Sequence, residues 1–206
     1  AICSGALTVA DAVDPAQTED NIPQKMFGPL IYTGDGSTTQ AQTGLGFQPD
    51  FTWIKQRNGT AGHKLFDSTR GVTKYVNSAN TDAETTETDS LKVFGSDGFS
   101  VGSNAGTGAN SSTYVGWNWR ANGGTTSTNT SGSVNSTVQA DPSGKNYVAY
   151  CFTDVEGYCK AAYYVGNGST DGPYIYTGFR PSIVMRKRVD GSGSWLVKDD
   201  ARNPTN

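Results

Sequence analysis

The chain has one histidine, so any chemistry that needs an imidazole depends on His63. A serine or cysteine nucleophile with a histidine base, or a metal site with a histidine ligand, would have to use it. A segment near the C-terminus repeats this part of the chain and carries Trp195 at the equivalent position. Because a tryptophan cannot replace a base, we predict a structural or surface role for His63.

Paired carboxylates are the second set of residues with catalytic potential. Glycoside hydrolysis needs two acids roughly 5 to 10 Å apart, and the candidates are Asp35, Asp67, Asp97, Asp154 and Glu156. Asp67 and Arg70 recur as Asp199 and Arg202, which we interpret as a repeated surface salt bridge or turn cap. Duplication of a whole catalytic set within one chain would be unusual. We therefore predict that the chain is not an enzyme and assign no catalytic residue.

Metal and phosphate sites have weak signals. Asp82, Glu84, Glu87 and Asp89 could gather a calcium ion, but their spacing lacks the EF-hand order. A solvated acidic loop is the favoured interpretation. The glycine-rich stretches at 34–36 and 166–168 are not followed by the residues of a phosphate loop, so we interpret them as turns. No metal or cofactor is predicted.

Aromatic residues form the best candidate binding site. Aromatic faces stack on sugars and anchor protein interfaces. The candidate binding or interface aromatics are Trp53, Tyr163, Tyr164, Tyr174, Tyr176 and Trp195. The alternative is that these side chains are ordinary core and cross-strand aromatic pairs of a β protein.

An internal repeat with a constant offset organises the chain. Gly34-Asp35-Gly36-Ser37 recurs as Gly166-Asn167-Gly168-Ser169, and Gly46-Phe47-Gln48-Pro49 recurs as Gly178-Phe179-Arg180-Pro181 (166 − 34 and 178 − 46 both equal 132). The register holds without a gap through the following strand, loop and second strand. This pattern indicates a duplicated β unit.

Composition agrees with a β architecture. Glycine contributes 26 of the 206 residues and apolar residues make up only 34%, which is typical of short strands joined by tight turns. We predict an all-β fold, specifically a β-sandwich with an internal partial repeat. The predicted organisation is an N-terminal arm or linker (1–27), a β-sandwich unit (28–121), a Gly/Ser/Thr-rich spacer (122–144) and a second, partial β repeat unit (145–206).

Alternating apolar residues bounded by turn residues predict the individual strands. In the first unit the strands are expected at 30–32, 50–55, 63–67, 91–94, 99–101 and 113–120. The last of these is the clearest, with Val115, Trp117 and Trp119 on one face that must be buried. In the second unit they are expected at 146–153, 162–164, 174–176, 183–185 and 195–199. Segment 78–90 is expected to be a loop or one helical turn.

Charge and hydropathy exclude several function classes. The net charge of −3 provides no basic field for nucleic acid, and no apolar run approaches the roughly 20 residues of a membrane span. Cys3, Cys151 and Cys159 have neither zinc-site spacing nor the density of a disulfide scaffold, although one bridge remains possible. The N-terminus is a poor signal peptide and lacks a methionine, so we expect a processed piece or part of a longer protein.

A series of motifs in a fixed order resembles a known family. The motifs are YTGDGS, GLGFQPDFTWIK, LFDSTRG, SDGF, TYVGWNWRANGG, YVAYCFTDVEGY, GNGSTDGPYIYTGFRP and DDARNP. Together they cover residues 28–206 and resemble an uncharacterised, repeat-containing family of tailed-bacteriophage virion proteins. The resemblance implies a β protein with a structural, tail or fibre-like role and supplies no catalytic residues.

The sequence therefore predicts a non-enzymatic structural component of a bacteriophage virion, either a capsid decoration protein or a tail or fibre component. Its expected partners are other virion proteins, with a homo-oligomeric assembly. The N-terminal arm and the spacer are expected to reach over neighbouring subunits. The alternative is a tail-fibre adhesion module that binds a host-surface glycan through the aromatic residues.

Overall fold

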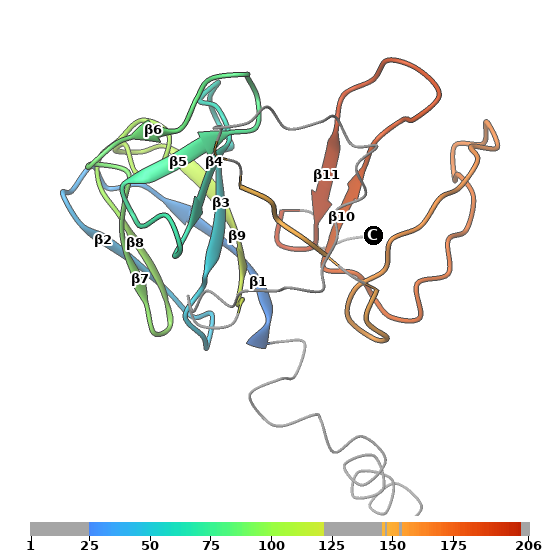
Figure 1. Ribbon diagram of the computed structural model, residues 1–206, viewed down its shortest axis with the longest axis horizontal. Coiled ribbons are helices and arrows are strands. Elements are labelled where there is room, and N and C mark those ends of the chain that lie inside the picture. Colours follow the sequence, from blue (N-terminus) through green and yellow to red (C-terminus); the bar gives the residue numbers. More distant parts are fainter. Residues whose placement is uncertain (1–24, 122–145, 147, 153, 203–206) are drawn as a thin grey trace, which may run out of the picture. The chain divides into compact units, whose positions relative to one another are not determined.

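The computed structural model describes residues 25–121, 146, 148–152 and 154–202 (Figure 1). The predicted N-terminal arm up to residue 24 and the spacer at 122–144 lie outside this part. The chain divides into two compact units, residues 1–125 with 182–206 and residues 126–181.

The strands of the described part are β1 (Phe27–Thr33), β2 (Gln40–Thr43), β3 (Phe51–Gln56), β4 (Lys64–Asp67), β5 (Lys74–Asn77), β6 (Thr85–Thr86), β7 (Leu91–Gly95), β8 (Gly98–Val101), β9 (Thr113–Trp119), β10 (Ile183–Arg186) and β11 (Leu196–Asp199).

The larger sheet of the first unit has six strands in the order β1-β9-β3-β4-β5-β6, and its neighbours pair in antiparallel directions. Strand β9 lies between β1 and β3, with Tyr114 opposite Tyr32 and Trp117 opposite Trp53. Its valine and aromatic residues favour a strand, and the strand is buried on both faces. The predicted burial of Val115, Trp117 and Trp119 is confirmed.

The smaller sheet has three strands in the order β2-β8-β7. Strands β7 and β8 form the hairpin that the sequence predicts, joined by Ser96 and Asp97. Gly98 begins β8 with φ of 147°, and a Cβ atom there would collide with the carbonyl oxygen of Gln42. The Asp97 carboxylate accepts the backbone N–H groups of Gly44 and Gly46 (3.1 and 2.6 Å), which ties the hairpin to the end of β2.

The two sheets pack into a sandwich around one apolar core. The buried core residues are Tyr32, Ile54, Phe66, Leu91, Phe99, Val101 and Tyr114. The rings of Tyr32 and Tyr114 stack with centroids 5.2 Å apart. Their hydroxyl groups donate to the carbonyl oxygens of Thr107 (2.7 Å) and Ala105 (2.9 Å), and burial raises the pKa of Tyr32 well above its ordinary value. The predicted all-β, sandwich-like fold is confirmed.

Strands β10 and β11 repeat β3 and β4. They form a two-stranded antiparallel hairpin in which Ile183 lies opposite Asp199, as Phe51 lies opposite Asp67 in the first copy. In both copies a lysine closes the connecting loop: Lys55 Nζ donates to the carbonyl oxygen of Ala61 (2.7 Å), and Lys187 Nζ donates to that of Gly193. The strands predicted at 183–185 and 195–199 are therefore present.

Other strands predicted for the second copy were wrong. The described residues of 146–153, and segments 162–164 and 174–176, are not in strands. In the first copy β1 satisfies its backbone groups by pairing with β9 along its whole length. Among the described residues no neighbouring strand performs this role for 162–164. Alternating apolar residues create an apolar face, but a strand also needs a partner for its N–H and C=O groups.

The sequence analysis did not predict β2, β5 and β6. Their sequences, QAQT, KYVN and TT, are short and mostly polar, so alternation is too weak to detect. The pairing of β6 with β5 also places a two-residue strand inside segment 78–90, which was predicted to be a loop or a helical turn. No helix in the described ranges is long and apolar enough to cross a membrane.

Phe66→Ala tests the core. Phe66 is fully buried between the sheets, so the substitution removes a ring and leaves a cavity. We expect the free energy of unfolding to fall by about 3–5 kcal/mol, measured by denaturant titration. Val93→Ala is the control: Val93 is exposed on β7, and its change should stay within about 0.5 kcal/mol. Equal effects of the two substitutions would contradict this assignment of the core.

Candidate functional site

The four candidate tyrosines belong to the second compact unit and are accessible to solvent. Tyr163, Tyr174 and Tyr176 are 78%, 90% and 77% exposed, and Tyr164 is partly exposed. Their backbone is irregular and not in strands. Gly168, between the two pairs of tyrosines, has a φ of 71°, which matches the 72° of its repeat counterpart Gly36. An aromatic face that stacks on a sugar or a partner protein must be open to water, and these side chains meet that requirement.

Trp53 and Trp195 belong to the first compact unit and differ from each other. Trp195 is largely exposed just before β11. Trp53, on β3, is half-buried and lies edge-to-face against Trp117, with ring centroids 5.2 Å apart. The structure thus gives Trp53 a packing role within the outer face of the large sheet. It divides the six predicted aromatics between two units whose relative placement is not defined.

His63 holds Trp53 in place. The indole Nε1 of Trp53 donates a 2.8 Å hydrogen bond to His63 Nδ1, and the two rings meet edge-to-face at 5.5 Å. Burial lowers the pKa of His63, and the positive charges of Lys55 and Arg202 lower it further. The imidazole is therefore neutral near pH 7, which is the form that can accept the indole hydrogen bond.

Four of the five candidate catalytic carboxylates act as acceptors in turns and loops. Asp97 binds the end of β2, and Asp67 binds Arg70. Asp35 accepts the backbone N–H of Ser37 at 2.8 Å, and hydrogen bonds from Ser37 lower its pKa. Asp154 accepts the backbone N–H of Ala161, and this bond, with the contact to Lys160, lowers its pKa. No pair of these residues is brought together as an acid and a base by any contact in the described part.

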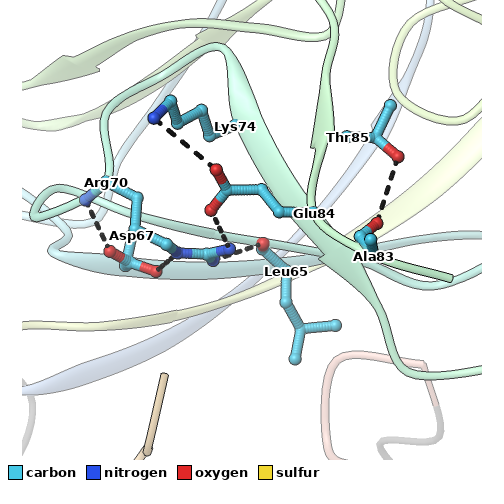
Figure 2. A network of polar contacts seen from close by, with 7 residues as sticks. All are labelled: Leu65, Asp67, Arg70, Lys74, Ala83, Glu84 and Thr85. Atoms are coloured by element: carbon cyan, nitrogen blue, oxygen red, sulfur yellow. Dashed lines mark hydrogen bonds and ion pairs between the residues drawn. The ribbon is translucent and has the colours of Figure 1, made fainter. Parts of the chain in front are cut away.

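The turn after β4 is held by an arginine that makes four contacts (Figure 2). The backbone N–H and Nε of Arg70 donate to the two carboxylate oxygens of Asp67 (2.9 and 2.5 Å). Nη2 donates to the carbonyl oxygen of Leu65 (3.0 Å), and Nη1 to Glu84 Oε2 (3.3 Å). Glu84 also pairs with Lys74 at 3.5 Å. The acidic segment is thus tied to β4 and β5 by cations of the protein.

The other acidic residues considered for calcium do not form a metal site in the described ranges. Glu87 accepts a hydrogen bond from Asn104, and Asp89 accepts one from Ser103. No group of three or more histidine, cysteine, aspartate or glutamate side chains is arranged to hold a metal ion there. Cys151 and Cys159 are free thiols in the same part of the chain.

The second copy reproduces the Asp–Arg turn and adds a contact to β9. The backbone N–H and Nε of Arg202 donate to Asp199 (2.8 and 2.5 Å), and Nη2 donates to the carbonyl oxygen of Val197 (2.8 Å). Asp199 also accepts the indole N–H of Trp117 at 2.9 Å, and the Arg202 guanidinium lies 4.9 Å from the centroid of that ring. The Asp199 side chain is 0% exposed. The repeated salt bridge predicted from the sequence is present, but its predicted surface position was wrong, because both aspartates are buried. In the second copy the pair also joins the hairpin to the large sheet.

Both copies contain a further hydrogen bond between a serine and an aspartate, and the two residues have exchanged positions between the copies. Ser68 Oγ donates to Asp50 Oδ1 at 3.0 Å in the first copy. In the second copy Ser182 occupies the position of Asp50 and Asp200 that of Ser68, and Ser182 Oγ donates to Asp200 Oδ2 at 2.9 Å. The turn thus keeps the same interaction with its donor and acceptor exchanged.

A family model matches two stretches of the chain, residues 22–144 and 139–206. The chain belongs to the DUF7483 family, a domain of unknown function. The second match covers the shorter copy of the repeat, and together the matches span nearly all of the chain. No curated protein and no solved structure matches it significantly. Membership of the DUF7483 family therefore groups the chain with related sequences but supplies no function.

Sequence reasoning missed a buried polar cluster around Lys64. Lys64 opens β4 on the same face as Phe66, and its side chain contacts Ser90 and Asn104. One signal was available: the repeat counterpart of Lys64 is Leu196, so a lysine stands at a position where the other copy has an apolar residue. Its partners come from loops distant in the sequence, and no local pattern predicts them.

Asp199→Ala tests the contact between the hairpin and β9. The change leaves the buried Trp117 N–H without an acceptor and Arg202 without its carboxylate, so the β10–β11 hairpin should open more easily. We expect the free energy of this opening to fall by about 3 kcal/mol, measured by amide hydrogen exchange of β11. Asp190→Ala is the control, because Asp190 pairs with Arg188 at the surface and should contribute less than about 1 kcal/mol. Unchanged exchange in Asp199→Ala would contradict the assigned contact.

Proposed function

We propose that the chain is a non-enzymatic structural component of a bacteriophage virion, acting as a capsid decoration protein or as part of the tail or a fibre. The observation that carries the proposal is the open β10–β11 hairpin. In the first copy, the equivalent strands β3 and β4 are flanked by β9 and β5. Within the described residues, β10 and β11 pair only with each other. Each therefore presents an unpaired edge, to which a strand of another subunit can add.

The side chains of this hairpin also favour assembly. Exposed apolar residues on β10 and β11 and in their loops are Val184, Met185, Val189, Trp195 and Leu196. The second compact unit, residues 126–181, adds the exposed Tyr163, Tyr174 and Tyr176. Aromatic residues and methionine are enriched at protein interfaces, so Met185 and Trp195 support a role of the hairpin in assembly. The phage assignment rests on the sequence motifs that resemble virion proteins. Closed, symmetric homo-oligomers are the commonest form of such assemblies.

Immunogold labelling of purified phage particles tests the proposal. An antibody against residues 28–206 should label intact particles at regular positions, on the head for a decoration protein and on the tail for a fibre component. The control is the same antibody after adsorption with the purified chain. Particles without label, from lysates in which the antigen is detected, would contradict the virion assignment.

A second candidate function is binding of a host-surface glycan, which the exposure of Tyr174 and Tyr176 favours. Stacking on an aromatic face contributes on the order of 1 kcal/mol. If Tyr176 forms such a contact, Tyr176→Ala should weaken binding on a glycan array several-fold. Val189→Ala is the matched control, because Val189 is equally exposed, at 76%, but offers no ring. Absence of any array signal, or equal losses in both variants, would contradict this function.

A further inference from the structure

Lys64 is buried beside neutral hydrogen-bonding groups. The whole residue is 8% exposed. Its Nζ donates to Ser90 Oγ and to Asn104 Oδ1, each at 2.8 Å. The nitrogen also lies 4.3 Å from the centroid of the Tyr75 ring. No carboxylate of the described residues forms an ion pair with it. A lysine nitrogen is thus held directly against the carboxamide of an asparagine.

The Asn104 carboxamide is fixed and polarised. Its Oδ1 accepts the backbone N–H of Gly106 at 2.8 Å in addition to Lys64 Nζ. Its Nδ2 donates to Glu87 Oε2 at 3.2 Å. The other carboxylate oxygen of Glu87 accepts the backbone N–H of Asp89 at 3.1 Å, which orients the carboxylate. Besides Lys64, one backbone donor therefore points at the carbonyl oxygen, and one carboxylate accepts from the amide nitrogen.

The lysine is also prepared to react as a neutral amine. Burial lowers the pKa of Lys64 to about 8, an effect that the negative charge of Glu87 partly opposes. A substantial fraction of the side chain is therefore neutral at slightly alkaline pH. A desolvated lysine of this kind is a nucleophile.

We propose that Lys64 and Asn104 join in an intramolecular isopeptide bond, with Glu87 as the proton carrier. The assignment rests on the contacts of the Lys64 nitrogen with the Asn104 carboxamide, of that carboxamide with Glu87, and of its oxygen with the Gly106 N–H. It goes beyond the proposed virion function, because the reaction modifies the protein itself.

The reaction balances without a further reagent. Rotation about the Cε–Nζ bond turns the lone pair of neutral Lys64 toward Cγ of Asn104, and an N–C bond forms. Negative charge develops on Oδ1, where the Gly106 N–H stabilises it. Glu87 takes a proton from the attacking nitrogen and delivers it to Nδ2. The Cγ–Nδ2 bond then breaks, ammonia leaves, and an amide joins the two side chains.

The bond would connect elements that the fold otherwise holds by packing and by hydrogen bonds. Lys64 lies in β4 of the six-stranded sheet, whereas Asn104 lies in the loop that leaves β8 of the smaller sheet. The link thus joins the two layers of the sandwich across 40 positions of sequence (104 − 64). Because the counterpart of Lys64 in the second copy is Leu196, we expect one such bond per chain.

The intact mass of the full chain tests the proposal. After reduction and denaturation, the mass should be lower than that of the sequence by one ammonia. Lys64→Arg, Asn104→Ala and Glu87→Gln should restore the full mass, because they remove the nucleophile, the carboxamide and the proton carrier. Lys55→Arg is the matched control. Lys55 also lies in the large sheet with a lowered pKa, but the hydrogen bonds of its Nζ to described residues go to the backbone carbonyl groups of Gly59 and Ala61, so the deficit should remain.

Peptide mapping decides between a cross-link and another loss of ammonia. A branched peptide that contains both Lys64 and Asn104 supports the proposal. Loss of ammonia confined to one linear peptide, as in cyclisation of Asn104, overturns it. A wild-type mass equal to that of the sequence, in protein shown to be folded by circular dichroism, also overturns it. Glu87→Gln keeps an acceptor for the Asn104 amide, so a full mass in a folded variant would assign proton transfer to the carboxylate.

Discussion

The fold depends on burying both faces of β9. Its inner face carries Tyr114 and Asn118 toward the smaller sheet, and its outer face carries Trp117 and Trp119. Gly116 leaves room for the Phe99 ring, which would lie 3.0 Å from a Cβ atom at that position. A strand that is apolar on both faces is stable only when it is covered on both. Tyr32 and Phe99 provide cover on the inner face, and Phe51, Trp53 and the Asp199–Arg202 pair provide it on the outer face.

Asn118 shows how a polar residue is accommodated inside this strand. Its Oδ1 accepts the hydroxyl of Thr52 at 3.0 Å, and its Nδ2 donates to the carbonyl oxygens of Gly28 and Gly116, each at 3.0 Å. These partners lie on β3, β1 and β9 itself. A buried amide is costly unless its donors and acceptors are paired. The satisfied amide therefore favours this one register of three strands over a slipped one.

The second copy of the repeat shows what the same sequence pattern does where the described residues include no such partner. Tyr32 is buried against Tyr114, whereas its counterpart Tyr164 is partly exposed. The Asp–Arg turn forms in both copies because all of its bonds are local. Within the described residues, the turn and the hairpin thus form in both copies, while the longer strand pairings form in the first copy alone. The result is a copy with open edges and exposed aromatics, which suits contacts with other molecules.

This division also explains what the sequence could predict. β1, β3, β4, the β7–β8 hairpin and β9 have alternating apolar residues and clear turns, and all were predicted. β2, β5 and β6 exist because the neighbouring strands offer backbone partners, and their own side chains carry little signal. The exposed tyrosines were recognisable as a group. The half-buried position of Trp53 was not, because it depends on His63, which precedes β4, and on Trp117, which lies opposite Trp53 on β9.

The buried lysine remains the feature most at odds with ordinary packing. A charged amine removed from water is costly, and replacing buried ionic groups with apolar residues is often neutral or stabilising. Leu196 stands at the equivalent place in the second copy, so the local backbone accepts an apolar side chain. A lysine is favoured over leucine at position 64 only by an interaction that leucine cannot make. An amide between Lys64 and Asn104 supplies one, because it removes the charge that burial penalises and converts the contact between the two sheets into a covalent bond.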